Sequence, residues 1–115
     1  MRRGDVYQVR LEPVEGSEQG GIRPAVLVSH DSLNLHSPVV IVVPLTSQRR
    51  ARLLPTHVLV PADEEGVDVE SVAKCEQVRA VAKSRLVRRR GPLSAAVMAQ
   101  VDRGLSKAMA LSPRP

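Results

Sequence analysis

Phe and Trp are absent from this sequence and Tyr occurs once, so aliphatic side chains must fill whatever core the chain forms. The hydrophobic fraction of 43% is nevertheless compatible with a folded globule packed by Val, Leu, Ile and Ala. A chain of 115 residues has room for one hydrophobic core. We therefore expect residues 1–115 to form a single domain.

Long apolar runs are missing as well. No segment approaches the roughly 18 apolar residues of a membrane span, and residues 1–5 lack the apolar part of a secretory signal, so we expect a cytoplasmic protein. Cys75 is the single cysteine, which excludes an intrachain disulfide and argues against a cysteine-based metal site. We expect Cys75 to be a buried strand residue, and we expect no cofactor.

Lysine is scarce, with 3 Lys against 14 Arg, and the net charge is +5. The planar guanidinium of Arg suits bidentate partners such as phosphate. A single charged run is usually only a solvated face, but two basic clusters on a small domain favour a polyanionic partner. The charged clusters are Arg49, Arg50 and Arg52; Lys83, Arg85, Arg88, Arg89 and Arg90; and the acidic Asp63, Glu64, Glu65, Asp68 and Glu70.

Short apolar segments rich in β-branched residues run through most of the chain, several of them alternating with polar residues as half-buried strands do. They lack the alternation with helices that a parallel sheet requires, and a small antiparallel sheet loses its exposed edges by closing into a compact barrel. The predicted strands are residues 6–11, 25–29, 39–43, 56–60, 71–74 and 76–81.

The C-terminal part has a different period. From residue 93 to residue 111, behind Gly91 and Pro92, apolar residues recur every three to four positions. This spacing predicts one amphipathic helix, which Gly104 should weaken.

A glycine-rich loop precedes the second predicted strand, with the sequence GSEQGGIRP at residues 16–24. Pro24 restricts Arg23 to an extended conformation, and two hydroxyls, Thr46 and Ser47, follow the third apolar run. Taken singly, such features are more often a turn, a solvated side chain and a strand end. Together they suggest that Arg23 and Thr46 converge at one rim.

Four segments, in this order, resemble the MazF/PemK family of toxins: residues 3–7 (RGDVY), 16–24, 43–47 (VPLTS) and 76–79 (EQVR). The resemblance extends from residue 3 to about residue 110. It implies a mainly-β fold, a small SH3-like barrel with a C-terminal helix. It also implies a homodimer that cuts single-stranded RNA at short sequences and is neutralised by a cognate antitoxin.

Carried over residue by residue, the resemblance assigns Arg23 and Thr46 as the catalytic pair. In some members the chemistry is ascribed instead to a basic residue and a carboxylate on a later strand, which match Lys74 and Glu76 here. Those members also use a histidine in the first loop, where this sequence has Ser17. We therefore rank Arg23 and Thr46 first.

The implied reaction is a transesterification without a metal ion, in which Arg23 stabilises the charged transition state. Arg23 is a poor proton carrier because its pKa lies far above neutrality. The candidates for the general base are Glu18, Glu76 and His57, and Glu76 has the alternative of a structural ion pair with Arg79. With so few aromatic residues to stack on bases, we expect RNA contacts from Ser17, Glu18, Gln19, Thr56, His57, Ser71, Gln77 and Arg79.

The sequence departs from the family pattern at Gln8, where an aromatic residue is common, and at Ala80, where Thr is frequent. These departures bear on the RNA contacts more than on the fold. Two other functions stay open at this point: a CcdB-like toxin of the same fold that poisons DNA gyrase, and an RNA-binding module without catalysis.

Overall fold

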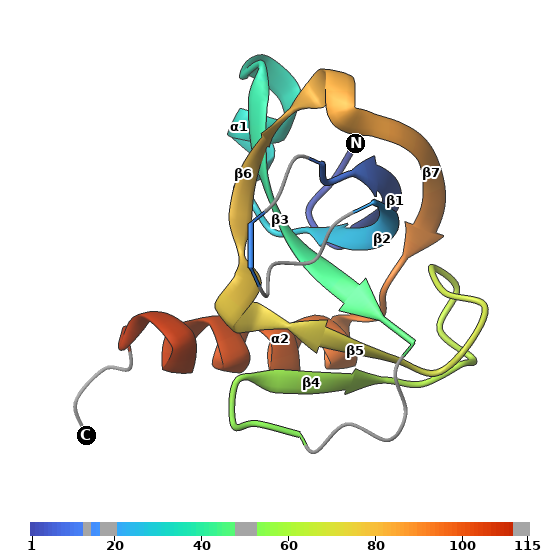
Figure 1. Ribbon diagram of the computed structural model, residues 1–115, viewed down its shortest axis with the longest axis vertical. Helices are drawn as coiled ribbons and strands as arrows, with labels where there is room; N and C mark the ends of the chain where they lie inside the picture. Colours follow the sequence, from blue (N-terminus) through green and yellow to red (C-terminus); the bar gives the residue numbers. More distant parts are fainter. Residues whose placement is uncertain (13–14, 17–20, 48–52, 112–115) are drawn as a thin grey trace.

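The computed structural model describes residues 1–12, 15–16, 21–47 and 53–111 (Figure 1). These residues form two helices, seven strands and two single 3₁₀ turns. In chain order the elements are β1 (Asp5–Arg10), β2 (Ile22–Leu27), α1 (Asp31–His36), β3 (Val39–Thr46), β4 (His57–Val60), β5 (Ser71–Lys74), η1 (Cys75–Gln77), β6 (Arg79–Ala82), η2 (Lys83–Arg85), β7 (Leu86–Pro92) and α2 (Ala95–Met109).

All strand pairs are antiparallel, and the strand order is β4-β5-β3-β2-β1-β7. The strand β6 pairs with the first half of β3, and β5 pairs with its last two residues. Both lie on the edge of β3 that β2 leaves free, so β5, η1 and β6 act as one bent strand, and the bend is visible in Figure 1.

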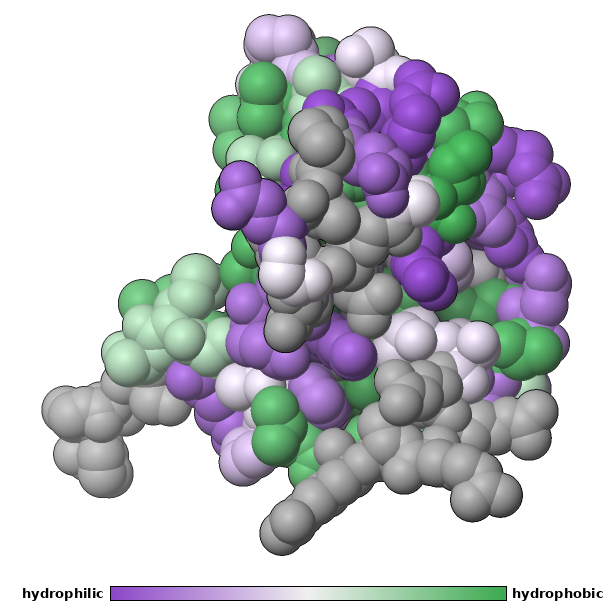
Figure 2. Space-filling view, viewed as in Figure 1, coloured by the Kyte–Doolittle hydropathy of each residue, from purple (hydrophilic) through white to green (hydrophobic). Residues whose placement is uncertain are grey.

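The predicted mainly-β fold with a C-terminal helix is confirmed, but the sheet does not close into a barrel, because no pairing among the described strands joins β4 to β7. Two register shifts interrupt the pairing of β7 with β1. Such irregularities twist an edge, and charged side chains protect it from further pairing. Arg88, Arg89 and Arg90 supply that charge, and Figure 2 shows hydrophilic residues along the side where Figure 1 has β7.

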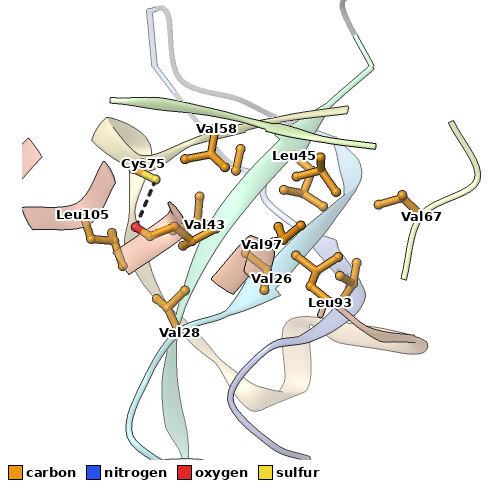
Figure 3. Close-up of a cluster of buried hydrophobic side chains, with 14 residues drawn as sticks. Val26, Val28, Val43, Leu45, Val58, Val67, Cys75, Leu93, Val97 and Leu105 are labelled. Atoms are coloured by element: carbon orange, nitrogen blue, oxygen red, sulfur yellow. Dashed lines mark hydrogen bonds between the residues drawn. The ribbon is translucent and has the colours of Figure 1, made fainter. Parts of the chain in front are cut away.

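Two apolar clusters form the core, one on each face of the curled sheet. The first lies between the sheet and α2, where Val97, Val101 and Leu105 of the helix meet Val43 and Val58 of the strands (Figure 3). The second fills the inside of the curl with the side chains of Val9, Leu11, Ala25, Leu27, Val40, Val42 and Val81. Aliphatic residues thus pack both sides, as the lack of Phe and Trp requires.

Cys75 is buried in the first cluster, and its thiol donates a hydrogen bond to the carbonyl of Val101 at 3.8 Å (Figure 3). Burial raises the pKa of this thiol to about 11. The residue is buried as predicted, but it begins the turn η1 and is not part of a strand. The same turn shortens the strand predicted over residues 76–81, which begins at Arg79.

The predicted C-terminal helix is confirmed with bounds two residues shorter at each end, because capping residues stop it. The Ser94 hydroxyl accepts the amide N–H of Val97, and the carboxylate of Glu64 accepts both the amide and the hydroxyl of Ser94. At the other end Ala110 takes a left-handed conformation. Among the described residues, no helix has both the length and the apolar character that crossing a membrane requires.

Besides the two 3₁₀ turns, one helix and one strand were not predicted, α1 and β7. The helix α1 has six residues, too few to show a helical period. The strand β7 consists of LVRRRGP, which has the composition of a solvated basic segment.

The first of the four family-like segments joins the N-terminus to distant elements. Arg3 donates hydrogen bonds to the carbonyl of Val28 at 2.8 Å and to Asp102 of α2 at 2.6 Å. Asp5 is buried beside Arg89 at 3.1 Å. Burial acts against the charge of Asp5, but the hydrogen bonds from Arg89 and from the amide of Arg2 outweigh it, so the pKa of Asp5 is lowered.

Candidate functional site

A cleft of about 180 Å³ lies where β2 begins and β3 ends. Its polar lining comes from β1, β2, the residue after β3, the loop before β5, the first residue of β5, and β7. The polar and charged lining residues are Gln8, Arg23, Ser47, Asp68, Ser71 and Arg90.

Arg23 is exposed on β2, opposite Val9 of β1. The pairing of β2 with β3 ends with Ala25 opposite Pro44, so Arg23 lies two residues before this end on β2 and Thr46 two residues after it on β3. Thr46 is buried at the end of β3, between Leu45 and Ser47, which both line the cleft. The structure therefore brings the two expected catalytic residues to one end of the sheet.

Arg90 and Asp68 enter the cleft as an ion pair from strand β7 and the loop before β5. One guanidinium nitrogen of Arg90, Nη2, donates to Oδ2 of Asp68. The side chain of Arg90 is 13% exposed, whereas that of Asp68 is 82% exposed. Arg90 is therefore mostly buried, whereas its partner Asp68 is a carboxylate that a ligand can reach.

Apolar side chains form the rest of the cleft wall. Pro24 comes from β2, Leu45 from β3, and Val67 and Val69 from the loop before β5. Ser71 is buried, and its hydroxyl donates to the carbonyl of Val69 at 2.9 Å, which fixes the end of this loop. The cleft combines two guanidinium groups with an apolar lining.

The base of the glycine-rich loop is clamped by hydrogen bonds. Gly21 has a φ of +74°, which glycine adopts readily, and its amide donates to Glu12 Oε2 at 2.7 Å. The guanidinium of Arg79 donates to the carbonyl of Leu11 at 3.1 Å, and that of Arg85 donates to the carbonyls of Arg10 and Glu12. Arg79, an expected RNA contact, thus uses one N–H to hold this loop.

Three of the expected site residues, Ser17, Glu18 and Gln19, lie outside the described residues, and so do Arg49, Arg50 and Arg52 of the first basic cluster.

Three further expected residues, Thr56, His57 and Glu76, form a second cluster, on the part of the sheet that α2 contacts. The Thr56 hydroxyl donates to Glu76 Oε1 at 2.8 Å, and His57 Nε2 lies 3.0 Å from Glu76 Oε2. The amide of Leu54 donates to His57 Nδ1 at 3.1 Å, so Nδ1 is the acceptor and Nε2 carries the proton. The side chain of His57 is only 6% exposed.

The carboxylate of Glu76 is stabilised in its charged form. Burial opposes the charge, but the hydrogen bonds from His57 and Thr56 outweigh it, so the pKa of Glu76 is lowered. The alternative ion pair of Glu76 with Arg79 does not form, because Arg79 bonds to Leu11. Both oxygens of Glu76 accept hydrogen bonds inside the cluster.

Lys74 and Gln77 lie beside this cluster. Lys74 ends β5 opposite His57 of β4, and Gln77 is half-buried at the end of η1. Neither residue lines the cleft of Arg23. The structure thus separates the two sets of catalytic candidates, with Arg23 at the cleft and Glu76 in the closed cluster.

Four residues that line the cleft were not predicted from the sequence to bind or catalyse: Gln8, Ser47, Asp68 and Arg90. Asp68 belongs to an acidic run and Arg90 to a basic one, and each run on its own is typical of a solvated face. A prediction of strand β7 would have been needed, because this strand brings Arg90 to the cleft. In the described part of the chain, no group of three or more His, Cys, Asp or Glu side chains is placed to hold a metal ion.

Comparison with known proteins gives a family match over nearly the whole chain. Residues 2–109 match the family described as PemK-like, MazF-like toxins of type II toxin–antitoxin systems. The chain belongs to this family. An endoribonuclease MazF from Staphylococcus saprophyticus is 41% identical to it over 111 residues, which cover 96% of this chain and 92% of that protein. The resemblance found in the sequence is thereby confirmed.

Two solved structures show the same fold. An endoribonuclease from a mycobacterial species, in complex with its cognate antitoxin, is 26% identical with a TM-score of 0.82, over 100% of this chain and 99% of that one. MazF from Deinococcus radiodurans is 26% identical with a TM-score of 0.82, over 96% of each chain.

Proposed function

We propose that this chain is an endoribonuclease toxin of a type II toxin–antitoxin system that cuts single-stranded RNA at the cleft of Arg23. Endoribonuclease activity follows from the family and from the relatives that carry this name. The observation that supports the location is the exposed guanidinium of Arg23, which lines a cleft together with the hydroxyls of Ser47 and Ser71. A guanidinium is suited to a phosphate because it donates two parallel hydrogen bonds.

The reaction we propose is a transesterification within the RNA. The 2′-oxygen of the ribose forms a bond to the adjacent phosphorus, and the bond from phosphorus to the 5′-oxygen breaks. The 2′-hydroxyl proton passes to a base, and the departing 5′-oxygen takes up a proton. The products are a 2′,3′-cyclic phosphate and a free 5′-hydroxyl. Because the nucleophile belongs to the substrate, positioning supplies much of the rate.

Arg23 contributes charge to this reaction and not proton transfer. It stabilises the extra negative charge on the phosphate oxygens in the transition state, with Thr46 as a hydrogen-bonding partner at the same strand end. Glu76 is a poor candidate for the base because His57 and Thr56 hold both of its oxygens and its lowered pKa weakens it as a proton acceptor. Of the two carboxylates that the sequence offered as the base, this leaves Glu18, which precedes Arg23 in the glycine-rich sequence.

A cognate antitoxin is the expected protein partner. The mycobacterial endoribonuclease of the same fold is found with its cognate antitoxin. A cleft that carries two arginines favours an acidic antitoxin segment that competes with RNA. We propose that the active form is a homodimer, as the family resemblance implies. Co-expression with the neighbouring gene's product, followed by mass measurement of the complex, tests both statements.

The experiment that tests the function is RNA cleavage in excess EDTA. Wild-type protein and the Arg23→Ala variant are incubated with a long RNA of mixed sequence, and the new ends are mapped and their chemistry is determined. We expect discrete cuts with cyclic phosphates from the wild type and almost none from the variant. Arg88→Ala is the matched control, because Arg88 is exposed on β7 and does not line the cleft.

Two results would contradict the proposal. Intact RNA at high wild-type concentration would favour a toxin that poisons a protein such as gyrase, or a module that binds RNA without cutting it. Equal cleavage by wild type and Arg23→Ala would place the chemistry elsewhere.

A further inference from the structure

The cleft of Arg23 contains more than a phosphate needs. A phosphate site is built from donors alone, whereas this cleft also holds a carboxylate, Asp68, and four apolar side chains. A carboxylate beside a phosphate costs energy because like charges repel. The apolar side chains offer a surface on which a flat ring can rest, and RNA-binding proteins recognise single strands through bases splayed away from the backbone. The lining therefore fits a ring with polar edges.

The pair of Asp68 and Arg90 has the chemistry to recognise such an edge. A carboxylate accepts hydrogen bonds and a guanidinium donates them, so the pair presents an acceptor beside a donor in a fixed order. A guanidinium has five N–H donors, and the bond to Asp68 uses one of them. Gln8 and Ser47 add groups that both donate and accept.

We propose that this cleft holds one nucleobase of the RNA, next to the phosphate bound by Arg23, and that Asp68 and Arg90 select that base. The inference rests on the proposed function, since it assigns part of the same substrate. Adenine and cytosine present an amino donor beside a ring-nitrogen acceptor, whereas guanine and uracil present a carbonyl acceptor beside an imino donor. With the backbone held at Arg23, a fixed order of acceptor and donor separates these two groups.

Placement in the fold supports selection by this pair. Arg90 is 13% exposed and sits on a strand that pairs with β1, and Ser71 fixes the end of the loop that carries Asp68. Rigid supports of this kind are what discrimination between bases requires. Gln8 lies on β1, opposite Pro24 of β2 and Arg88 of β7, so three paired strands form one side of the cleft.

The first test maps cleavage sites. Wild-type protein and Asp68→Asn cut the same RNA pool, and the bases around each cut are counted. We expect wild type to favour particular bases at one fixed position beside the cut, and Asp68→Asn to reduce that preference roughly 10-fold to 100-fold, because the amide places a donor where the acceptor stood. The overall cutting rate should change much less than the preference.

Two control variants accompany this test. Asp63→Asn changes an acid that lies in the same loop and outside this cleft, and Arg88→Gln removes a charge from β7 outside the cleft. Both should keep the wild-type preference. Thermal melts should show that Asp68→Asn folds, since its side chain is 82% exposed.

The second test does not need cleavage. Binding of the wild type, Asp68→Asn and Arg90→Gln is measured with 2′-O-methyl RNA hexamers, which have no free 2′-hydroxyl to react. We expect the two variants to lose discrimination between hexamers that differ at a single base. Uniform weakening across all hexamers would indicate a phosphate site and overturn the proposal, as would an unchanged preference in Asp68→Asn. Uncut RNA in the first test would contradict the proposed function, and the binding measurement would still decide the base pocket.

Discussion

The cleft of Arg23 and the cluster of His57 and Glu76 contain similar residue types, but the two regions differ in how their polar groups are used. In the cluster, both ring nitrogens of His57 and both oxygens of Glu76 have partners within the protein. In the cleft, the described side chains include two guanidinium groups and one carboxylate around an open volume. The first arrangement links parts of the protein to one another, and the second places charged side chains around a space that a ligand can enter.

This contrast shows that a group of titratable residues indicates a functional site only where the fold places them around a space that a ligand can enter. His57 has the residue type of a catalytic base, yet its tautomer and position serve the loop before β4, through Leu54, and the turn η1, through Glu76. These hydrogen bonds join the loop before β4 to η1. We infer that this cluster positions the end of the loop that follows Thr46.

The largest expected effect is on the cleft side of the comparison. Arg23→Ala should lower the single-turnover cleavage rate by roughly 10²- to 10³-fold, the usual loss when one transition-state donor is removed. Arg23→Lys should recover only part of the rate, because an ammonium keeps the charge without the planar fork. Equal rates for Arg23→Lys and wild type would show that bidentate geometry is not required.

Gly104→Ala should have the next largest effect, on the cluster side. A methyl group at Gly104 would lie 2.7 Å from the sulfur of Cys75 and 3.2 Å from the carbonyl of Thr56, so α2 would be pushed from η1 and β4. We expect a loss of about 1–3 kcal/mol in unfolding free energy from overpacking, against a gain of at most about 1 kcal/mol in helix propensity. Urea denaturation measures the net change.

The control for that substitution is Ala99→Gly, at an exposed position of the same helix. It should cost roughly 1 kcal/mol through propensity alone. If Gly104→Ala stabilised the protein, the close contact of α2 with Cys75 would not limit packing.

Glu76→Gln should be a smaller change and should separate structure from catalysis. The Gln side chain can still accept from Thr56, but its amide N–H₂ faces the N–H of His57, whose other nitrogen already accepts from Leu54. One hydrogen bond is lost, and we expect the unfolding free energy to fall by about 1 kcal/mol. The cleavage rate and its pH profile should stay close to wild type. A large loss of rate in a folded variant would restore Glu76 as a base.

The smallest expected effect is in acid. The folded-state pKa of Glu76 lies below its ordinary value of 4.5, so the stabilisation from this carboxylate is complete above that pH and is lost as pH falls through the folded pKa. The stability gap between wild type and Glu76→Gln should therefore be constant near neutrality and shrink below about pH 4.5. Urea titrations across this range measure the gap. A gap that grew in acid would reverse the sign of the shift.

Much of this fold could be predicted because local sequence and tertiary structure agree. The runs of Val in β3 and the spacing of Val97, Val101 and Leu105 in α2 have one natural interpretation each, and both predictions are confirmed. The strand β7 could not be predicted, because two of its three consecutive arginines are held by long-range partners, Asp5 for Arg89 and Asp68 for Arg90. The same arginines put charge on β7, which is an edge strand of the open sheet.

The candidate site divides in the same way. Arg23 stands between a glycine-rich loop and Pro24, and Thr46 ends an apolar strand, so both carried a local signal as well as the family resemblance. Asp68 and Arg90 had no such signal. They are 22 positions apart in the sequence, and only the folded sheet brings them into contact. Glu76 was a reasonable candidate by residue type, and its partners Thr56 and His57 could not be deduced from spacing.

Because the first strand pairs with the last one, the cleft can be complete only after β7 has been synthesised. The cleft takes Gln8 and Arg23 from the first strands, but Arg90 comes from β7, which pairs with β1. At two thirds of its length the growing chain therefore contains Arg23 and Thr46 but lacks Arg90, and with it one side of the cleft. Because such long-range pairing closes late, a cell has nearly the whole time of translation in which an incomplete toxin cannot hold its RNA in the proposed way.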